Sequence, residues 1–294
     1  MLDLEAYMGE RRRQVEQWLD LHLPPETERP AVLHRAMRYS VLAGGKRLRP
    51  VLCMASCAAV GGTAALCLPA AAALEIVHTY TLIHDDLPCM DADDLRRGRP
   101  TAHVVFGEGN ALLAGDALLT LAFEWLAAAP APAPYPPTQL AAELAVAAGS
   151  RGVIAGQVED LEAEGAPPDA DRLRFIHQHK TGALRRAAVR MGAIAGGAPE
   201  STLASLSAYG EHVGLAFQIA DDIPNATSTP AALGKPAGSD AALGKLTYVA
   251  VYGLDAARRK AEDEATLACQ AIASLRGDTA PLTALAHYAV RRST

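Results

Sequence analysis

Two pairs of adjacent aspartates, Asp85 with Asp86 and Asp221 with Asp222, are the residues of this chain whose types and spacing point most directly to chemistry. Each pair follows an apolar stretch with helical spacing, so we expect each to leave a hydrophobic helix. Carboxylates this close raise one another's pKa unless a cation lies between them. Mg²⁺ is the cation that suits oxygen ligands and phosphate together. The pairs therefore predict facing carboxylate clusters around a shared metal site.

The run from Leu82 to Thr101 adds phosphate-binding groups to the first pair. It contains five aspartates and then three arginines, namely Asp85, Asp86, Asp91, Asp93, Asp94, Arg96, Arg97 and Arg99. The planar guanidinium group suits phosphate oxygens, so the run indicates metal and phosphate binding. The alternative is a solvated acidic loop, which is the usual meaning of a charge cluster. The second aspartate pair favours the metal site.

The position of Asp91 requires a break in the preceding helix. It lies six residues after Asp85, roughly 240° around an ideal α-helix. Pro88 lies between them, lacks a backbone donor and clashes with the preceding turn. We therefore expect a kink that swings Asp91 back towards Asp85, so that both contact one metal.

Three further polar groups interrupt apolar helical segments. Gly44 and Gly45 precede Lys46 and Arg49, which fits either a helix C-cap with cations favoured by the helix dipole or a diphosphate site. His78 lies two turns before Asp85 on the same face, where a lone histidine is commonly a hydrogen-bonded core residue.

A lysine and a hydroxyl, Lys180 and Thr181, lie inside an Ala/Leu helix just before Gly182, where glycine costs about 1 kcal/mol relative to alanine. Buried, they require an anionic partner. Lys235 and Lys245 lie ten residues apart, around a Pro- and Gly-containing loop from 225 to 238. That loop is a candidate mobile lid that closes on phosphate, although each lysine alone would pass as a surface residue.

The elements that position these groups are predicted to be helices. Hydrophobic residues make up 50% of the 294 residues and aromatic residues only 5%. Alanine and leucine dominate and sustained strand patterns are missing, which predicts an all-α protein of one domain, residues 1–294. Periodicity with Gly and Pro punctuation predicts helices near 5–22, 30–43, 50–60, 70–87, 109–128, 138–163, 171–195, 200–223, 240–253, 255–275 and 281–291.

Composition also argues against several classes of protein. A net charge of −6 without a basic stripe speaks against nucleic-acid binding, and five cysteines without paired CxxC spacing indicate neither a disulfide framework nor a zinc site. The uncharged stretch 51–74 is long enough to span a bilayer, but 61–63 and Pro69 interrupt it, which favours two buried core helices and no stable membrane insertion. No signal-peptide pattern opens the chain, so we expect a soluble, cytoplasmic protein.

Taken together, these motifs resemble those of the trans-isoprenyl diphosphate synthases, and of bacterial farnesyl diphosphate synthases in particular. The resemblance extends from 45–50 through both aspartate motifs to 233–235 and 245–248, and the long first motif is its most specific part. It implies a single all-α bundle around a deep central cavity, and a homodimer. It also implies Mg²⁺-dependent, head-to-tail condensation of isopentenyl diphosphate with an allylic diphosphate.

The resemblance further implies roles for individual residues. The Mg²⁺ ligands would be Asp85, Asp86, Asp91 and Asp221. Contacts to the allylic substrate would come from Arg96, Lys180, Gln218, Lys235 and Lys245, and Lys180, Thr181 and Gln218 would stabilise the carbocation. Isopentenyl diphosphate would be held by Gly45, Lys46, Arg49, His78 and Arg97.

The second motif departs from the family pattern Asp-Asp-x-x-Asp, because Asn225 replaces the last aspartate and Pro224 precedes it. A proline forfeits a helical hydrogen bond. Either the helix ends there harmlessly or the metal site is weakened. A regulatory subunit of such a synthase therefore stays open as an alternative, as does a class I terpene cyclase, although a cyclase needs no second anion site.

Product length is predicted from Tyr80, five residues before the first aspartate. Five steps place it roughly 140° past one full turn, close to one and a half turns back along the helix. The resemblance implies that an aromatic ring there goes with a C15 product, farnesyl diphosphate, while the smaller Thr81 tunes the length. A tyrosine packed in a helix interface and a C20, geranylgeranyl product are the alternatives.

Overall fold

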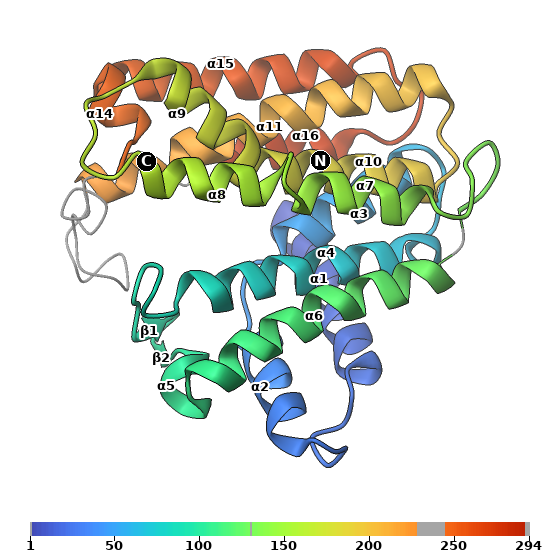
Figure 1. The fold of residues 1–294 in the computed structure, drawn as a ribbon. Coiled ribbons are helices and arrows are strands. Elements are labelled where there is room, and N and C mark those ends of the chain that lie inside the picture. The colour runs from blue at the N-terminus through green and yellow to red at the C-terminus, as the bar shows by residue number, and fades with distance from the viewer. Residues whose placement is uncertain (1, 130, 228–244, 292–294) are drawn as a thin grey trace.

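A computed structural model of the chain describes residues 2–129, 131–227 and 245–291, and they are almost entirely helical (Figure 1). Within those residues the strands form one small antiparallel hairpin, of β1 (Leu95–Arg96) and β2 (Arg99–Pro100). The prediction of an all-α protein is therefore confirmed.

The first half of the chain surrounds one buried helix. Its helices are α1 (Leu4–His22), α2 (Ala31–Val41), α3 (Leu48–Ala59), α4 (Ala64–Asp85), α5 (Ala102–Phe106) and α6 (Glu108–Ala128). The apolar side chains of α4 point in all directions, so it is covered on several sides, by α3, α6 and α10. Its C-terminal end carries the first aspartate motif.

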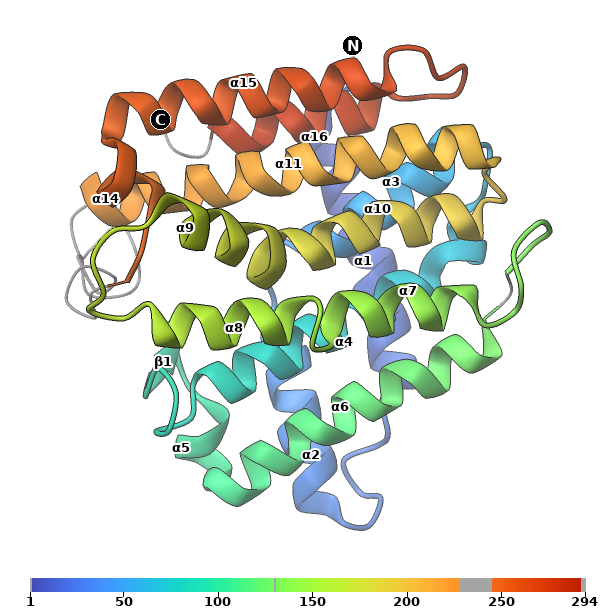
Figure 2. The ribbon, with the colours of Figure 1, turned by 45° about the horizontal axis from the view of Figure 1, so that its top comes forward.

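The second half forms successive rows of helices, which Figure 2 shows from α8 through α10 and α11 to α15. Its helices are α7 (Gln139–Ala148), α8 (Val153–Glu162), α9 (Ala170–Ile176), η1 (His177–Gly182), α10 (Ala183–Ala195), α11 (Glu200–Thr227), α14 (Tyr248–Tyr252), α15 (Leu254–Ile272) and α16 (Ala280–Arg291). The π-helix η1 joins α9 to α10 without a break.

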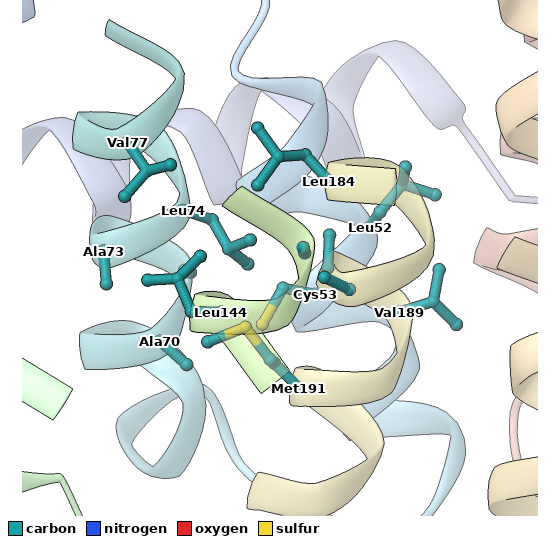
Figure 3. Packing of buried hydrophobic residues seen from close by; sticks show 14 of the residues in the cluster. Leu52, Cys53, Ala70, Ala73, Leu74, Val77, Leu144, Leu184, Val189 and Met191 are labelled. Carbon is teal, nitrogen blue, oxygen red and sulfur yellow. The ribbon is translucent and has the colours of Figure 1, made fainter. Parts of the chain in front are cut away.

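The core is aliphatic and closely packed. One cluster of buried residues extends from Val15 to Ala289 and so joins both halves of the chain. At its centre, residues such as Leu74 of α4, Leu52 of α3 and Met191 of α10 face one another (Figure 3). Gly192 of α10 crosses α3 so closely that a Cβ there would lie 2.0 Å from the Cys53 carbonyl oxygen.

Most predicted helices are present, with four differences. The stretch 51–74 is divided between α3 and α4 as predicted, but Pro69 lies inside α4. The single helix predicted for 138–163 is wrong, because the chain breaks at 149–152 between α7 and α8. A Cβ at Gly152 would lie 2.0 Å from the Ala147 carbonyl oxygen, so this tight turn requires glycine. The hairpin and the short α5 were not predicted.

The fourth difference lies in the second aspartate helix, predicted to end at 223. It continues through Pro224 to Thr227, so residues 225–227 of the predicted lid are helical. The rest of that lid, with Lys235, lies outside the described residues, as does the start of the helix predicted for 240–253, of which α14 is observed.

Two described helices, α4 and α6, are long and apolar enough to cross a membrane by length and composition. Of the most apolar 18 residues of each helix, 67% are buried in α4, whereas only 33% are buried in α6.

Candidate active site

The first aspartate motif lies where α4 ends. Asp85 is the last helical residue and Asp86 is the C-cap. After a turn that contains Pro88, the backbone amide of Asp91 donates to the carbonyl oxygen of Asp85 at 2.9 Å. The predicted return of Asp91 towards Asp85 is confirmed, although α4 ends at this point and does not kink.

Asp85 lies in a partly dry environment among charged groups of both signs. Burial raises its pKa to about 6, the Lys180 ammonium opposes this rise, and the neighbouring Asp91 carboxylate adds to it. Lys245 and Arg96 also favour the charged form. Two predicted metal ligands, Asp85 and Asp91, and three predicted phosphate contacts are thus brought together.

The two lysines are held by carboxylates. Lys245 donates to Asp91 Oδ1 at 3.0 Å, and Lys180 donates to Asp160 Oδ2 at 2.6 Å. Asp160 was not predicted, because its neighbours Glu159 and Glu162 make the segment look like a solvated helix face. The signal was present, since Val153, Gly156 and Asp160 share the buried face of α8 with helical spacing.

Asp86 and Arg96 form a bidentate pair. The Nε of Arg96 lies 2.7 and 2.9 Å from the two oxygens of the buried Asp86 carboxylate. Because Arg96 lies on β1, this pair holds the hairpin against the end of α4. The carboxylate predicted to bind metal and the guanidinium predicted to bind diphosphate are therefore engaged with each other here.

The two aspartates of the second motif differ in environment. Asp221 keeps 41% of its side chain exposed and lies 3.6 Å from Arg185 Nη2. Asp222 is buried, and it accepts hydrogen bonds from the Gln218 amide at 3.0 Å and the Tyr248 backbone nitrogen at 2.7 Å. It also lies 3.3 Å from His177 Nε2. Asp222 thus fastens α11 to η1 and α14, and Gln218 is turned towards it.

A cationic cluster lies further back along α4, around His78. Burial, followed by the nearby guanidinium groups of Arg49, Arg97 and Arg185, holds the pKa of His78 well below its usual range, so the imidazole is neutral at pH 7. Arg97 donates to the Gly44 carbonyl oxygen.

Gly45 makes room for this arginine. Its φ is 130°, and a Cβ there would lie 2.7 Å from Arg97 Nη1. Lys46 is exposed and lies over the Tyr288 ring at 5.8 Å from its centroid, so Gly45, Arg49, His78 and Arg97 gather while Lys46 faces α16.

Arg47 has a separate role that the sequence did not reveal. It is buried, begins α3 with a φ of 50°, and donates to Glu75 Oε1 at 2.6 Å and to the Val41 carbonyl oxygen at 2.6 Å. Because an unpaired buried charge is strongly destabilising, this pair ties the loop to α4. A charge run in the sequence does not distinguish the inward Arg47 from its exposed neighbour Lys46.

Lys180 and Thr181 lie on the π-helix η1, a rare element that is frequent at functional sites. Helix α8 crosses it at Gly156, where a Cβ would lie 2.0 Å from the Lys180 backbone nitrogen. This close approach brings Asp160, one turn further along α8, within reach of the Lys180 ammonium.

Tyr80 is buried and packs edge-on against the His84 ring, with centroids 5.6 Å apart. No hydrogen-bond partner for its hydroxyl is found among the described residues. Burial, and then the Asp85 carboxylate, raises its pKa, which puts the ring near the aspartates. The Thr81 hydroxyl donates to the His78 carbonyl oxygen at 2.8 Å, within α4.

The carboxylate oxygens of the first motif are suitable ligands for Mg²⁺ that is bound together with a diphosphate. Asp85 and Asp91 are hard oxygen ligands whose charges oppose one another. Within the described ranges, no three His, Cys, Asp or Glu side chains form a metal site by themselves. Mg²⁺ is characteristically held by one or two carboxylates plus substrate phosphates, so these residues suit it when phosphate is present. The deep central cavity stays a prediction.

Comparison with known proteins identifies the family. The family model for polyprenyl synthetase matches residues 30–276. Geranylgeranyl pyrophosphate synthase 12, chloroplastic, of Arabidopsis thaliana is 47% identical over 292 residues, covering 97% of this chain and 81% of the plant protein.

Solved structures agree with this assignment. An FPP/GFPP synthase from Zymomonas mobilis has a TM-score of 0.86 at 35% identity, covering 98% of this chain and 99% of that one. Geranylgeranyl pyrophosphate synthetase from Pyrococcus horikoshii has a TM-score of 0.88 at 32% identity, covering 97% and 98%. With its aspartate motifs, its cationic cluster and these matches over nearly its whole length, the chain belongs to the polyprenyl synthetase family.

Proposed function

We propose that this prenyltransferase joins isopentenyl diphosphate to an allylic diphosphate in a Mg²⁺-dependent reaction. The observation that carries the proposal is the presence of two separate clusters of charged groups along α4, each of which contains cations that a diphosphate would need. One is the cationic cluster of Arg49, His78 and Arg97, and the other is the cluster of Asp85, Asp91, Lys180 and Lys245. Two diphosphate substrates need two sites, whereas a terpene cyclase needs one.

The residues divide the work between the two substrates. Asp85, Asp91 and Asp221 would hold Mg²⁺, and the bound Mg²⁺ would supply positive charge to the leaving diphosphate. Lys180 and Lys245 would donate hydrogen bonds to the same leaving group as its charge grows, which stabilises the transition state more than the ground state. Arg49 and Arg97 would fix the isopentenyl diphosphate. The aliphatic walls would exclude water from the cation, and the departing pyrophosphate would accept the proton.

Farnesyl diphosphate is the product that Tyr80 supports, because a buried ring near the aspartates would limit the room for a growing chain. Geranylgeranyl diphosphate is the second candidate, supported by the name of the Arabidopsis relative. The name of the Zymomonas neighbour includes farnesyl diphosphate, whereas that of the Pyrococcus neighbour, like that of the Arabidopsis relative, includes geranylgeranyl diphosphate.

We also propose a homodimer formed through α6. This helix leaves Leu112 and Leu113 exposed at 45% and 56%, on an element apolar enough to be buried. These two exposed leucines on so apolar a helix are the reason for placing the contact between subunits there.

Product analysis tests the activity. Purified enzyme is incubated with Mg²⁺, isopentenyl diphosphate and either dimethylallyl, geranyl or farnesyl diphosphate, and the chain lengths are measured. We expect condensation that stops when EDTA is added. Asp85→Ala and Asp221→Ala should each lower turnover by orders of magnitude and keep the helical circular dichroism spectrum. Near-normal turnover in either variant would contradict the metal assignment.

A further inference from the structure

A buried carboxylate on α8 lies between the two described lysines that the site offers to a diphosphate. The Asp160 side chain is 8% exposed, accepts a hydrogen bond from Lys180 at 2.6 Å and lies 3.9 Å from Lys245 Nζ. Lys245 in turn donates to Asp91 at 3.0 Å. Negative and positive groups thus alternate in the order Asp91, Lys245, Asp160 and Lys180. This series of ionic contacts links the end of the first motif, the segment before α14, helix α8 and the π-helix η1.

We propose that Asp160 is a positioning residue that holds the ammonium groups of Lys180 and Lys245 in place for the allylic diphosphate. The inference rests on the proposed condensation, and it assigns to α8 a part in a site otherwise built from α4, η1, α11 and the segment before α14.

The physical reason lies in the lysine side chain. Its ammonium is carried on a flexible four-carbon stem, and ordering that stem on a substrate lowers the affinity and the rate. An ammonium has three N–H donors. Asp160 occupies one donor of Lys180, which leaves two for phosphate oxygens. Because the stem is ordered before substrate arrives, the two ammonium groups meet the leaving group with little reorganisation.

Asp160 is poorly suited to contact the substrate itself. A carboxylate repels a diphosphate, and its oxygen is already engaged by Lys180. Its charge is also not needed to join α8 to η1, because the two backbones already meet at Gly156. Its remaining effect is therefore on the lysines.

Removal of the charge without a change of shape tests the inference. In Asp160→Asn we expect kcat with the allylic substrate to fall roughly 10- to 100-fold, as expected for a misplaced catalytic group, with the KM for isopentenyl diphosphate within about twofold of wild type. Glu159→Gln is the matched control, since Glu159 is the neighbouring residue of α8 and pairs outward with Arg172 at 2.5 Å. It should leave both constants unchanged. Wild-type kcat in Asp160→Asn would overturn the inference.

A double-mutant cycle distinguishes positioning from general support of the fold. If Asp160 acts through the lysines, Asp160→Asn should have little further effect in a Lys180→Gln background. Equal losses in both backgrounds would overturn the inference, because a structural or metal-binding carboxylate would act independently of Lys180. Asp160→Glu keeps the charge and should recover at least part of the lost kcat. If the Asn variant does not fold, Lys180→Gln decides the question, since wild-type kcat in Lys180→Gln would show that the position of this ammonium does not matter and would overturn the inference.

A binding measurement separates this inference from the proposed reaction. Inorganic pyrophosphate with Mg²⁺ is titrated into each variant by calorimetry. We expect weaker binding in Asp160→Asn than in Glu159→Gln, by roughly tenfold. Equal affinity would overturn the positioning role even if condensation is observed. If Asp160→Asn binds pyrophosphate more weakly than Glu159→Gln but the wild type forms no prenyl product, the proposed reaction fails and the positioning role stands.

Discussion

At the scale of single residues, Asp85 shows a conflict between stability and function. It is an ionisable group whose burial and acidic neighbour favour the neutral form, at a position where a metal needs the charged form. Active sites characteristically keep such unfavourable groups, so their removal can stabilise a protein while it abolishes activity.

We therefore predict that Asp85→Asn stabilises the metal-free protein in a pH-dependent way. A pKa raised from 3.8 to about 6 corresponds to about 1 to 3 kcal/mol. A group with a raised pKa contributes stability that is fully present below its unfolded pKa and is lost as pH rises through the folded pKa. The free energy of unfolding of the variant should thus exceed that of wild type by this amount at pH 8 and match it near pH 4. Urea unfolding in the presence of EDTA measures it.

The exposed neighbour Asp94 provides the control, because its side chain is 83% exposed. Asp94→Asn should change stability by less than about 0.5 kcal/mol at both pH values. An Asp85→Asn difference that does not vary with pH would argue against a titrating buried carboxyl.

Tyr80 is predicted to limit product length. Tyr80→Ala removes a buried ring near the aspartates, so longer products, geranylgeranyl diphosphate or beyond, should appear in chromatographic analysis. Thr81→Ser, which keeps the helix-directed hydroxyl and removes only a methyl group, should shift the spectrum much less. A wild type that releases mainly C20 product, or an unchanged spectrum in Tyr80→Ala, would contradict the assignment.

At the scale of elements, the crossing of α8 and η1 depends on one missing side chain. We predict that Gly156→Ala lowers both stability and activity, because its Cβ would lie 2.0 Å from the Lys180 backbone nitrogen and force the two helices apart. Overpacking of this kind costs about 1 to 3 kcal/mol. Thermal unfolding and kcat are the measurements.

Gly9→Ala in α1 is the matched control. Nothing lies within 4 Å of a Cβ at that position, so alanine should keep or slightly raise stability. Similar losses of stability and kcat in Gly156→Ala and Gly9→Ala would contradict the claim that the close crossing of α8 and η1 requires glycine.

The sequence predicted the helices better than the contacts between them. Apolar periodicity located α4 and α11, and Pro88 correctly indicated the return of Asp91, because these features depend on neighbouring residues. Asp160 and Arg47 were missed, since their partners, Lys180 and Glu75, lie far away in sequence. The continuation of α11 through Pro224 shows tertiary packing overriding a local preference.

At the scale of the whole molecule, α6 connects an exposed apolar surface to the first aspartate motif. The His84 ring fits against Gly115, where a Cβ would lie 2.1 Å from its Nε2, and Nε2 donates to the Leu112 carbonyl oxygen at 3.0 Å. The residue next to Asp85 is thus fixed to the helix that we propose as the dimer interface.

We predict that Leu113→Glu produces a monomer with reduced activity. A charge at this 56% exposed position would be buried without a partner in a dimer through α6. Light scattering after size exclusion measures the mass. Leu21→Glu on α1, at an 80% exposed position, should leave mass and turnover unchanged. A wild-type monomer, or a dimer that survives Leu113→Glu, would count against this interface.

The buried pair of Arg47 with Glu75 also makes the chain's response to trypsin informative. The sequence here is Lys46-Arg47-Leu48-Arg49-Pro50. Trypsin can cut the bond between Arg47 and Leu48, whereas it cuts the bond between Arg49 and Pro50 poorly. Cleavage after Arg47 therefore requires the start of α3 to detach and expose a side chain that is only 1% accessible. When opening is fast relative to cleavage, the digestion rate reports the fraction of open molecules. Isopentenyl diphosphate should slow that rate if the adjacent Arg49 and Arg97 hold it, so a protease can report occupancy of this substrate site in the absence of turnover.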